Sequence, residues 1–209
     1  MRVAVLDSGI FPHVDLREKI IYGKNFTDEG NSQNTTDNFG HGTHIAGIIH
    51  SIVPDAQILI VKVLDRYGKG STLDIAEGIY YAIEKNVDII NMSFNCEKCV
   101  DIENAIDDAL EKGITIVAAS GNNNIIEYPA SRDDVLAVGS LSSEDNISKF
   151  SSDKCDAYEV GEDIYSTYIN DSYEYMTGTS MATAKVTGYI VKELIDSSVG
   201  RSSIWMKNI

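Results

Sequence analysis

Four polar residues stand beside or near glycines, in settings where their side chains could do chemistry. Asp7 directly follows an apolar run at residues 3–6, and a carboxylate at a strand end can orient a histidine, hold a metal or accept a phosphoryl group. His41 lies between two glycines, which let a substrate approach the imidazole closely. Ser180 precedes a predicted helix, where its own amide and the positive helix end suit a developing oxyanion. Asn122 ends a predicted strand and carries an amide that can donate to an oxyanion.

Each of these residues, taken alone, is more often structural than functional. Asp7 and Ser180 are typical of turns and helix N-caps, and Asn122 is followed by two further asparagines, as in a turn. His41 and His44 could be read as a metal pair, but no glutamate lies between them, as a zinc protease of that type would need. For His44 we expect a hydrogen-bonded, structural role. A catalytic role is therefore indicated only when the four residues are considered together.

Short apolar runs alternate with helix-like stretches along the chain. The runs are rich in Val and Ile and flanked by turn residues, which is typical of strands buried in a parallel sheet. The alternation predicts an α/β fold, with a mostly parallel central sheet and helices on both faces. Residues 140–175 are expected to hold short strands at most. The predicted strands are residues 3–6, 58–64, 87–92, 114–119 and 135–138, and the predicted helices are residues 44–52, 73–86, 102–112 and 182–194.

The composition excludes several classes of protein. The chain has 209 residues, of which 43% are apolar and 23% charged, as in an ordinary globular protein with a substantial core. The formal net charge of −15 disfavours nucleic acid and anionic membranes as partners and favours cationic ones. No apolar run is long enough for a signal peptide or a membrane span. We therefore expect a soluble cytoplasmic protein whose three cysteines are free thiols.

The flanking sequences make the set of four residues specific. The segments that frame them are Asp7-Ser8-Gly9, His41-Gly42-Thr43-His44, Ser120-Gly121-Asn122 and Gly178-Thr179-Ser180-Met181-Ala182. In this order, they resemble the subtilisin-like serine proteases (subtilases, peptidase S8 family), and the resemblance extends over most of residues 2–190. It implies the three-layer subtilisin-like fold, with a single catalytic domain over residues 1–209.

The resemblance also implies a role for each residue. Ser180 would attack a peptide carbonyl, His41 would take and return its proton, and Asp7 would hold the imidazole. Asn122 and the Ser180 amide would stabilise the oxyanion. Two segments would pair with the backbone of an extended substrate. They are Gly68-Lys69-Gly70 and Ser93-Phe94-Asn95. The resemblance implies no cofactor and no metal.

Glu127 bears on specificity. By the same resemblance, the position before Tyr128-Pro129-Ala130 lies at the floor of the pocket for the residue that precedes the cleaved bond. A carboxylate there favours Arg or Lys through a charge-assisted contact, and the net charge acts in the same direction. The alternative is a surface glutamate on a shortened loop, and the sequence leaves both interpretations open.

Several positions depart from the subtilase pattern. Phe94-Asn95-Cys96 replaces the usual glycine pair after Met-Ser, which changes one wall of the substrate cleft, and Ala184 and Lys185 replace a usual Pro and His. The helix after His41 runs on without the insertion that builds the high-affinity calcium site of many relatives, so we expect no calcium site of that type. The few residues before Asp7 leave no pro-segment, so the protein folds unaided or a pro-segment was removed.

A serine endopeptidase is the first functional hypothesis. Its substrate would be a peptide or protein, and the small size and basic preference favour limited processing, such as leader-peptide removal from a precursor with Arg or Lys near the cleavage site. The alternative is a pseudoprotease that binds peptides without cutting them, which the altered cleft wall and the Ala184-Lys185 pair keep open. A nucleotide-binding module is disfavoured, because no phosphate-binding glycine motif follows the first apolar run.

Overall fold

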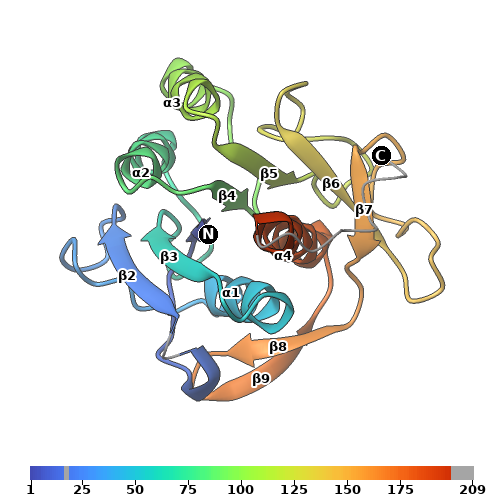
Figure 1. The fold of residues 1–209 in the computed structure, drawn as a ribbon, viewed down its shortest axis with the longest axis horizontal. Coiled ribbons are helices and arrows are strands. Elements are labelled where there is room, and N and C mark those ends of the chain that lie inside the picture. Colours follow the sequence, from blue (N-terminus) through green and yellow to red (C-terminus); the bar gives the residue numbers. More distant parts are fainter. Residues whose placement is uncertain (17–18, 199–209) are drawn as a thin grey trace.

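A parallel sheet of seven strands forms the centre of the structure (Figure 1). The computed structural model describes residues 1–16 and 19–198. The strand order is β2-β3-β1-β4-β5-β6-β7, and every neighbouring pair is parallel. The strands are β1 (Arg2–Asp7), β2 (Ile20–Asn25), β3 (Gln57–Lys62), β4 (Ile89–Met92), β5 (Thr115–Ala119), β6 (Leu136–Leu141) and β7 (Ala157–Val160).

The α-helices of the described residues cover both faces of this sheet. Helices α2 and α3 pack together on one face, and α1 and α4 pack together on the other (Figure 1). An antiparallel hairpin of β8 and β9 packs against α1. The predicted three-layer α/β fold is therefore confirmed. The remaining elements are η1 (Val14–Leu16), α1 (His41–Ile52), α2 (Thr72–Glu84), α3 (Val100–Glu111), β8 (Ile164–Tyr168), β9 (Ser172–Met176) and α4 (Thr179–Ser198).

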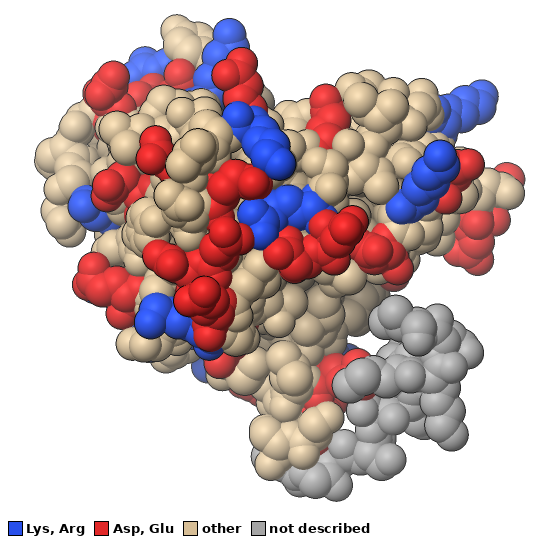
Figure 2. Space-filling model, turned by 90° about the horizontal axis from the view of Figure 1, so that it is seen from above, with Lys and Arg blue, Asp and Glu red and all other residues tan. Residues whose placement is uncertain are grey.

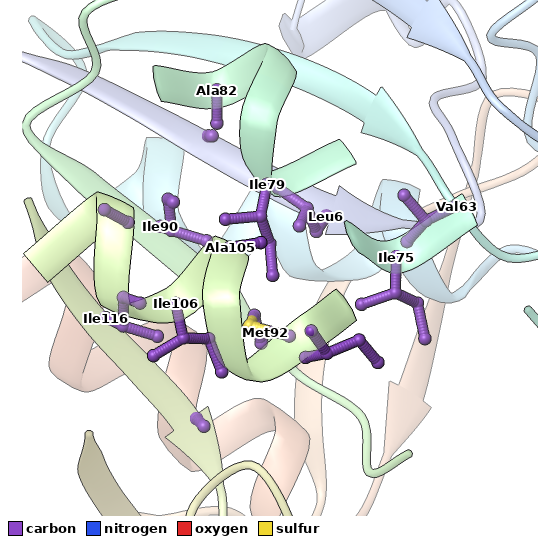
Figure 3. Close-up of a cluster of buried hydrophobic side chains, with 14 of the residues drawn as sticks. Leu6, Val63, Ile75, Ile79, Ala82, Ile90, Met92, Ala105, Ile106 and Ile116 are labelled. Atoms are coloured by element: carbon purple, nitrogen blue, oxygen red, sulfur yellow. The ribbon is translucent and has the colours of Figure 1, made fainter. Parts of the chain in front are cut away.

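The core is divided by the sheet into two hydrophobic clusters. In β1, Ala4 and Leu6 belong to the cluster under α2 and α3, whereas Val3 and Val5 belong to the cluster under α1 and α4. Figure 3 shows the first cluster, with Leu6 and Ile79 of α2 among its members. Because both faces are covered, the central strands consist of apolar runs, which is the pattern that predicted them.

The switch in strand order lies at β1. The chain builds β2 and β3 on one side of β1 and β4 to β7 on the other. In open parallel sheets, ligand sites form beside the carboxyl ends of the strands at such a point. Asp7 is the last residue of β1, and Ser93 directly follows β4. The fold therefore brings these two positions to one crevice.

Acidic side chains lie on much of the face shown in Figure 2, with basic ones scattered between them. This face includes α2 and α3, whose exposed acidic residues are Glu77, Glu84, Asp101, Asp107, Asp108 and Glu111. A surface of this charge attracts cationic molecules. Within residues 1–16 and 19–198, no helix is both long and apolar enough to cross a bilayer.

Candidate active site

Asp7, which is buried, and His41, which is half-buried, form a carboxylate–imidazole pair. His41 is the first residue of α1, and its Nδ1 lies 2.9 Å from both carboxylate oxygens of Asp7. An ionised carboxylate only accepts hydrogen bonds, so Nδ1 carries the proton and Nε2 is left as an acceptor. Burial lowers the pKa of His41, but the charge and hydrogen bond of Asp7, with the charge of Asp37, raise that pKa above its ordinary value.

Asp37 organises the start of α1. Its Oδ1 accepts from the amides of Phe39 and Gly40, at 2.9 and 2.8 Å, and its Oδ2 accepts from the amide and hydroxyl of Thr43, at 2.9 and 2.6 Å. These bonds satisfy amides that the helix itself leaves open. Helix α1 therefore begins at His41, three residues before the predicted start. Asp37 is not among the site residues predicted from the sequence, where its only signal is a residue type that caps helices.

The loop after β1 is held from two sides. Ser8 Oγ accepts from the amide of Gly42 at 2.9 Å, and a Cβ on Gly42 would lie 2.4 Å from the carbonyl oxygen of Gly9. The glycine after the histidine is thus required by the close approach of α1 to this loop. On the other side, the buried Lys62 ammonium donates to the carbonyl of Ser8 at 2.6 Å and pairs with Glu29 at 3.2 Å.

Ser180 is the second residue of α4 and is tied to the end of β4. Its hydroxyl donates to the carbonyl of Ser93 at 2.7 Å, and the Ser93 hydroxyl donates to the carbonyl of Ser180 at 3.0 Å. Asn91 Nδ2 supports Ser93 Oγ at 2.9 Å. Among the described residues, the Ser180 hydroxyl makes no hydrogen bond to His41. The hydroxyl is therefore engaged with Ser93 and not with the imidazole.

Asn122 presents a free amide donor next to Ser180. Its Oδ1 accepts from the amide and the hydroxyl of Thr179, at 3.0 and 3.1 Å, so the orientation of the side-chain amide is set by these bonds. Its Nδ2 has no hydrogen-bond acceptor within the described part of the chain, and Asn122 and Ser180 line the same cavity. An amide placed in this way can donate to an oxyanion that forms beside Ser180. Thr179 is not among the site residues predicted from the sequence.

The cavity beside Ser180 has a volume of about 340 Å³. Three of the predicted substrate-binding residues, Phe94, Asn95 and Glu127, lie in its wall. Glu127 therefore lines the same cavity as Ser180. Ser93 does not line the cavity but contacts Ser180 directly, as described above. The complete lining is Phe94, Asn95, Ala119, Gly121, Asn122, Asn123, Glu127, Thr179 and Ser180.

The predicted segment Gly68-Lys69-Gly70 lies apart from this cavity, close to Phe39. A Cβ on Gly68 would lie 2.8 Å from the Phe39 ring, and the centroid of that ring is 6.3 Å from the centroid of the His41 ring. Both the amide and the carbonyl of Lys69 are hydrogen bonded within their own turn. The Gly68 carbonyl and the Gly70 amide have no hydrogen-bond partner in the part of the chain described. The Gly70 carbonyl likewise has no hydrogen-bond partner among the described residues.

His44 is a structural histidine, as expected. Its Nε2 lies 3.0 and 3.1 Å from the carbonyl oxygens of Ile164 and Glu174, which links α1 to the β8–β9 hairpin. Burial lowers its pKa to about 4, so the ring is neutral near pH 7. The described residues contain no group of three or more His, Cys, Asp or Glu side chains placed to hold a metal ion. The three cysteines are free thiols.

An imidazole held by a buried carboxylate, with a serine at a nearby helix start and a free amide donor, is the set of groups that serine hydrolases use. Comparisons with known proteins agree with this class. The model of the subtilase family (Peptidase S8) matches residues 1–196. The chain therefore belongs to the subtilase family of serine proteases, as its motifs indicated.

Three relatives and one solved structure illustrate the similarity. The chain is 40% identical to the major intracellular serine protease of Bacillus subtilis (strain 168), over 90% of this chain and 66% of that protein. It is 38% identical to the intracellular serine protease of Paenibacillus polymyxa, over 96% of this chain and 69% of that protein. It is also 38% identical to the thermophilic serine proteinase of Bacillus sp. (strain AK1), over 97% of this chain and 53% of that protein. It thus spans about half to two-thirds of the length of these relatives. The crystal structure of a cold adapted subtilisin-like serine proteinase matches with a TM-score of 0.86 at 29% identity, over 93% of this chain and 75% of that one.

Proposed function

We propose that this chain is a serine endopeptidase that cleaves peptide bonds in peptide or protein substrates. Ser180 Oγ attacks the carbonyl carbon while His41 Nε2 accepts the hydroxyl proton, and His41 then gives this proton to the leaving amine. Water hydrolyses the acyl-enzyme through the same imidazole. Asp7 keeps the ring in the required tautomer and stabilises the imidazolium, without itself being protonated.

The Asp7–His41 pair is the observation that carries this proposal. Two contacts of 2.9 Å join Nδ1 to a carboxylate that is wholly buried. Such a pair leaves Nε2 free to act as a base, and the raised pKa of His41 favours the imidazolium that forms during attack. Membership of the subtilase family supports the same reaction class.

A peptide-binding pseudoprotease is the second candidate, because the Ser180 hydroxyl is engaged with Ser93. Lys185, which helped to keep this alternative open, pairs with Glu159 at 3.3 Å and does not line the cavity. A fluorophosphonate probe separates the two candidates. We expect covalent labelling of Ser180, found by mass spectrometry of the labelled peptide, and no labelling of the His41→Ala variant. Absence of labelling in the unmodified protein, together with retained peptide binding, would establish the pseudoprotease.

Replacing Asn122 by alanine is expected to lower kcat about 10²–10³-fold, which is the usual cost of losing one oxyanion donor. The KM should change little, because the charge on oxygen develops only in the transition state. Steady-state kinetics on one peptide amide give both values. Asn104→Ala, at an exposed position of α3, is the matched control. A raised KM with unchanged kcat would show instead that Asn122 holds the bound substrate.

We further propose that Glu127 selects a basic residue before the cleaved bond. A peptide with Arg at that position should be cut about 10–100-fold faster, in kcat/KM, than its Leu analogue, since a charge-assisted hydrogen bond is worth about 1.5–3 kcal/mol. Glu127→Gln keeps the shape of the side chain but removes its charge, so it should abolish most of this preference. Equal rates for the two peptides, or the opposite order, would show that Glu127 does not select the residue before the cleaved bond.

We also propose that residues 1–209 act as a single catalytic domain, in the cytoplasm, in limited processing such as removal of a leader peptide. Two of the relatives are named intracellular serine proteases, and the basic preference would restrict the number of sites cut. Digestion of a peptide library, read by mass spectrometry with Ser180→Ala as control, tests the processing role. Cleavage confined to a few sequences with Arg or Lys supports it, and cleavage at most peptides contradicts it.

A further inference from the structure

Glu127 has no cationic partner among the described residues. It is half-buried and lines the cavity beside Ser180, where its contacts are neutral amides. Elsewhere among the described residues, three half-buried glutamates pair with Lys or Arg, and they are Glu29, Glu103 and Glu159. Other half-buried carboxylates form no ion pair within this part of the chain, but they do not line this cavity, and they are Asp65, Asp74, Glu162 and Glu193. A charge left without such a partner in a cavity fits a ligand that brings the opposite charge.

Two asparagine side chains hold this carboxylate, one at each oxygen. Asn123 Nδ2 donates to Oε1 of Glu127 at 2.9 Å, and Asn95 Nδ2 donates to Oε2. Asn95 belongs to the segment after β4 and Asn123 to the segment after β5. The carboxylate is therefore fixed between two walls of the cavity, and each of its oxygens keeps a further acceptor position.

Gly121 closes the other side of the carboxylate. A Cβ at this position would lie 2.4 Å from Oε2 of Glu127 and 3.1 Å from its Cδ and Cγ. The side chain of Glu127 thus lies directly on the Gly121 backbone, and this glycine also has a φ of +104°, which disfavours other residues. Because the backbone blocks this side, a ligand must reach the remaining acceptor positions from the cavity.

We propose that Asn95 and Asn123 make the pocket selective for arginine over lysine. A guanidinium presents two parallel N–H groups in one plane, one for each free acceptor position of an oriented carboxylate. An ammonium is a strongly hydrated point charge and gains little from that orientation. This inference rests on the proposed function and deepens it. Asn95 and Asn123 act as positioning residues, since they work through Glu127.

The test compares kcat/KM for peptides that differ only in the residue before the cleaved bond, which is Arg, Lys or the neutral arginine isostere citrulline. The kcat/KM for the Arg peptide should exceed that for the Lys peptide by about tenfold. It should exceed that for the citrulline peptide by more, because citrulline has the shape of arginine without its charge. Asn95→Gly and Asn123→Ala should each reduce the Arg-to-Lys ratio to about two. Asn170→Gly, in the β8–β9 turn where φ is +62°, is a matched control and should keep the ratio of the unmodified protein.

The outcomes separate the inference from the proposed function. Equal rates for Arg and Lys, both ahead of Leu, would overturn the selectivity for arginine and leave the basic preference intact. An unchanged Arg-to-Lys ratio in both asparagine variants would overturn the role of the amides. If no peptide is cut, binding of the same peptides to the Ser180→Ala protein, followed by fluorescence anisotropy, still ranks Arg against Lys. Tighter binding of the Arg peptide would then support the inference while the endopeptidase proposal fails.

Discussion

Replacing Ser180 by alanine is expected to lower kcat/KM about 10⁶-fold, and replacing His41 by alanine should cost nearly as much. Both side chains serve one step, in which the hydroxyl attacks as the imidazole takes its proton. The double variant should therefore be no slower than Ser180→Ala alone, since the group that remains has nothing to act on. The measurement is kcat/KM for one Arg-containing peptide on all three variants.

The residual rates in this experiment need a control for traces of unmodified enzyme. Treatment of each variant with fluorophosphonate before the assay inactivates such traces, because only an intact site reacts. Ser143→Ala, at an exposed position in a surface loop, should keep the rate of the unmodified protein. A double variant much slower than both single variants would contradict a shared step, and rapid cleavage by Ser180→Ala would point to another nucleophile.

The fold could be predicted from the sequence where strands are covered on both faces. Strand β2 (Ile20–Asn25) was missed, because it lies at the edge of the sheet and its pattern is interrupted. Its pairing with β3 shifts register between Tyr22 and Lys24, and a Cβ on Gly23 would lie 2.0 Å from the carbonyl oxygen of Ile60. A bulged edge strand of this kind shows neither a continuous apolar run nor a clean alternation.

The places of Asp7, His41, Asn122 and Ser180 in the fold could be predicted because each stands at or near a strand end or a helix start. Contacts between loops could not be predicted, because they depend on how the segments that follow different strands meet in space. The sequence left Glu127 open between pocket and surface, and it predicted the segment of Asn95 as a substrate-pairing segment with an altered wall, but not a contact between the two. The hydrogen bond between Asn95 and Glu127 joins residues 32 positions apart. The bond between Ser180 and Ser93 spans 87 positions, and nothing in either local sequence indicates it.

Replacing Asp7 by asparagine is expected to lower kcat about 10⁴-fold while leaving the fold intact. The amide nitrogen of asparagine would face Nδ1 of His41, which would then have to accept a hydrogen bond. The ring proton would move to Nε2, the atom that must take the proton of Ser180. Steady-state kinetics measure the loss, and Asp28→Asn, at an exposed position, is the matched control that should keep the full rate.

The pH profile of the Asp7→Asn variant distinguishes this explanation from a general loss of structure. Activity needs a neutral imidazole, so kcat/KM rises with pH through the pKa of His41, which the charge of Asp7 holds above its ordinary value. Without that charge, burial lowers the pKa of His41 with less opposition, and the rising limb of the residual activity should shift to lower pH. If kcat/KM rises over the same pH range in the variant as in the unmodified protein, a group other than His41 sets that pH dependence. The direction of the shift follows from the sign of the missing charge, so it tests the carboxylate–imidazole pair independently of the size of the loss in rate.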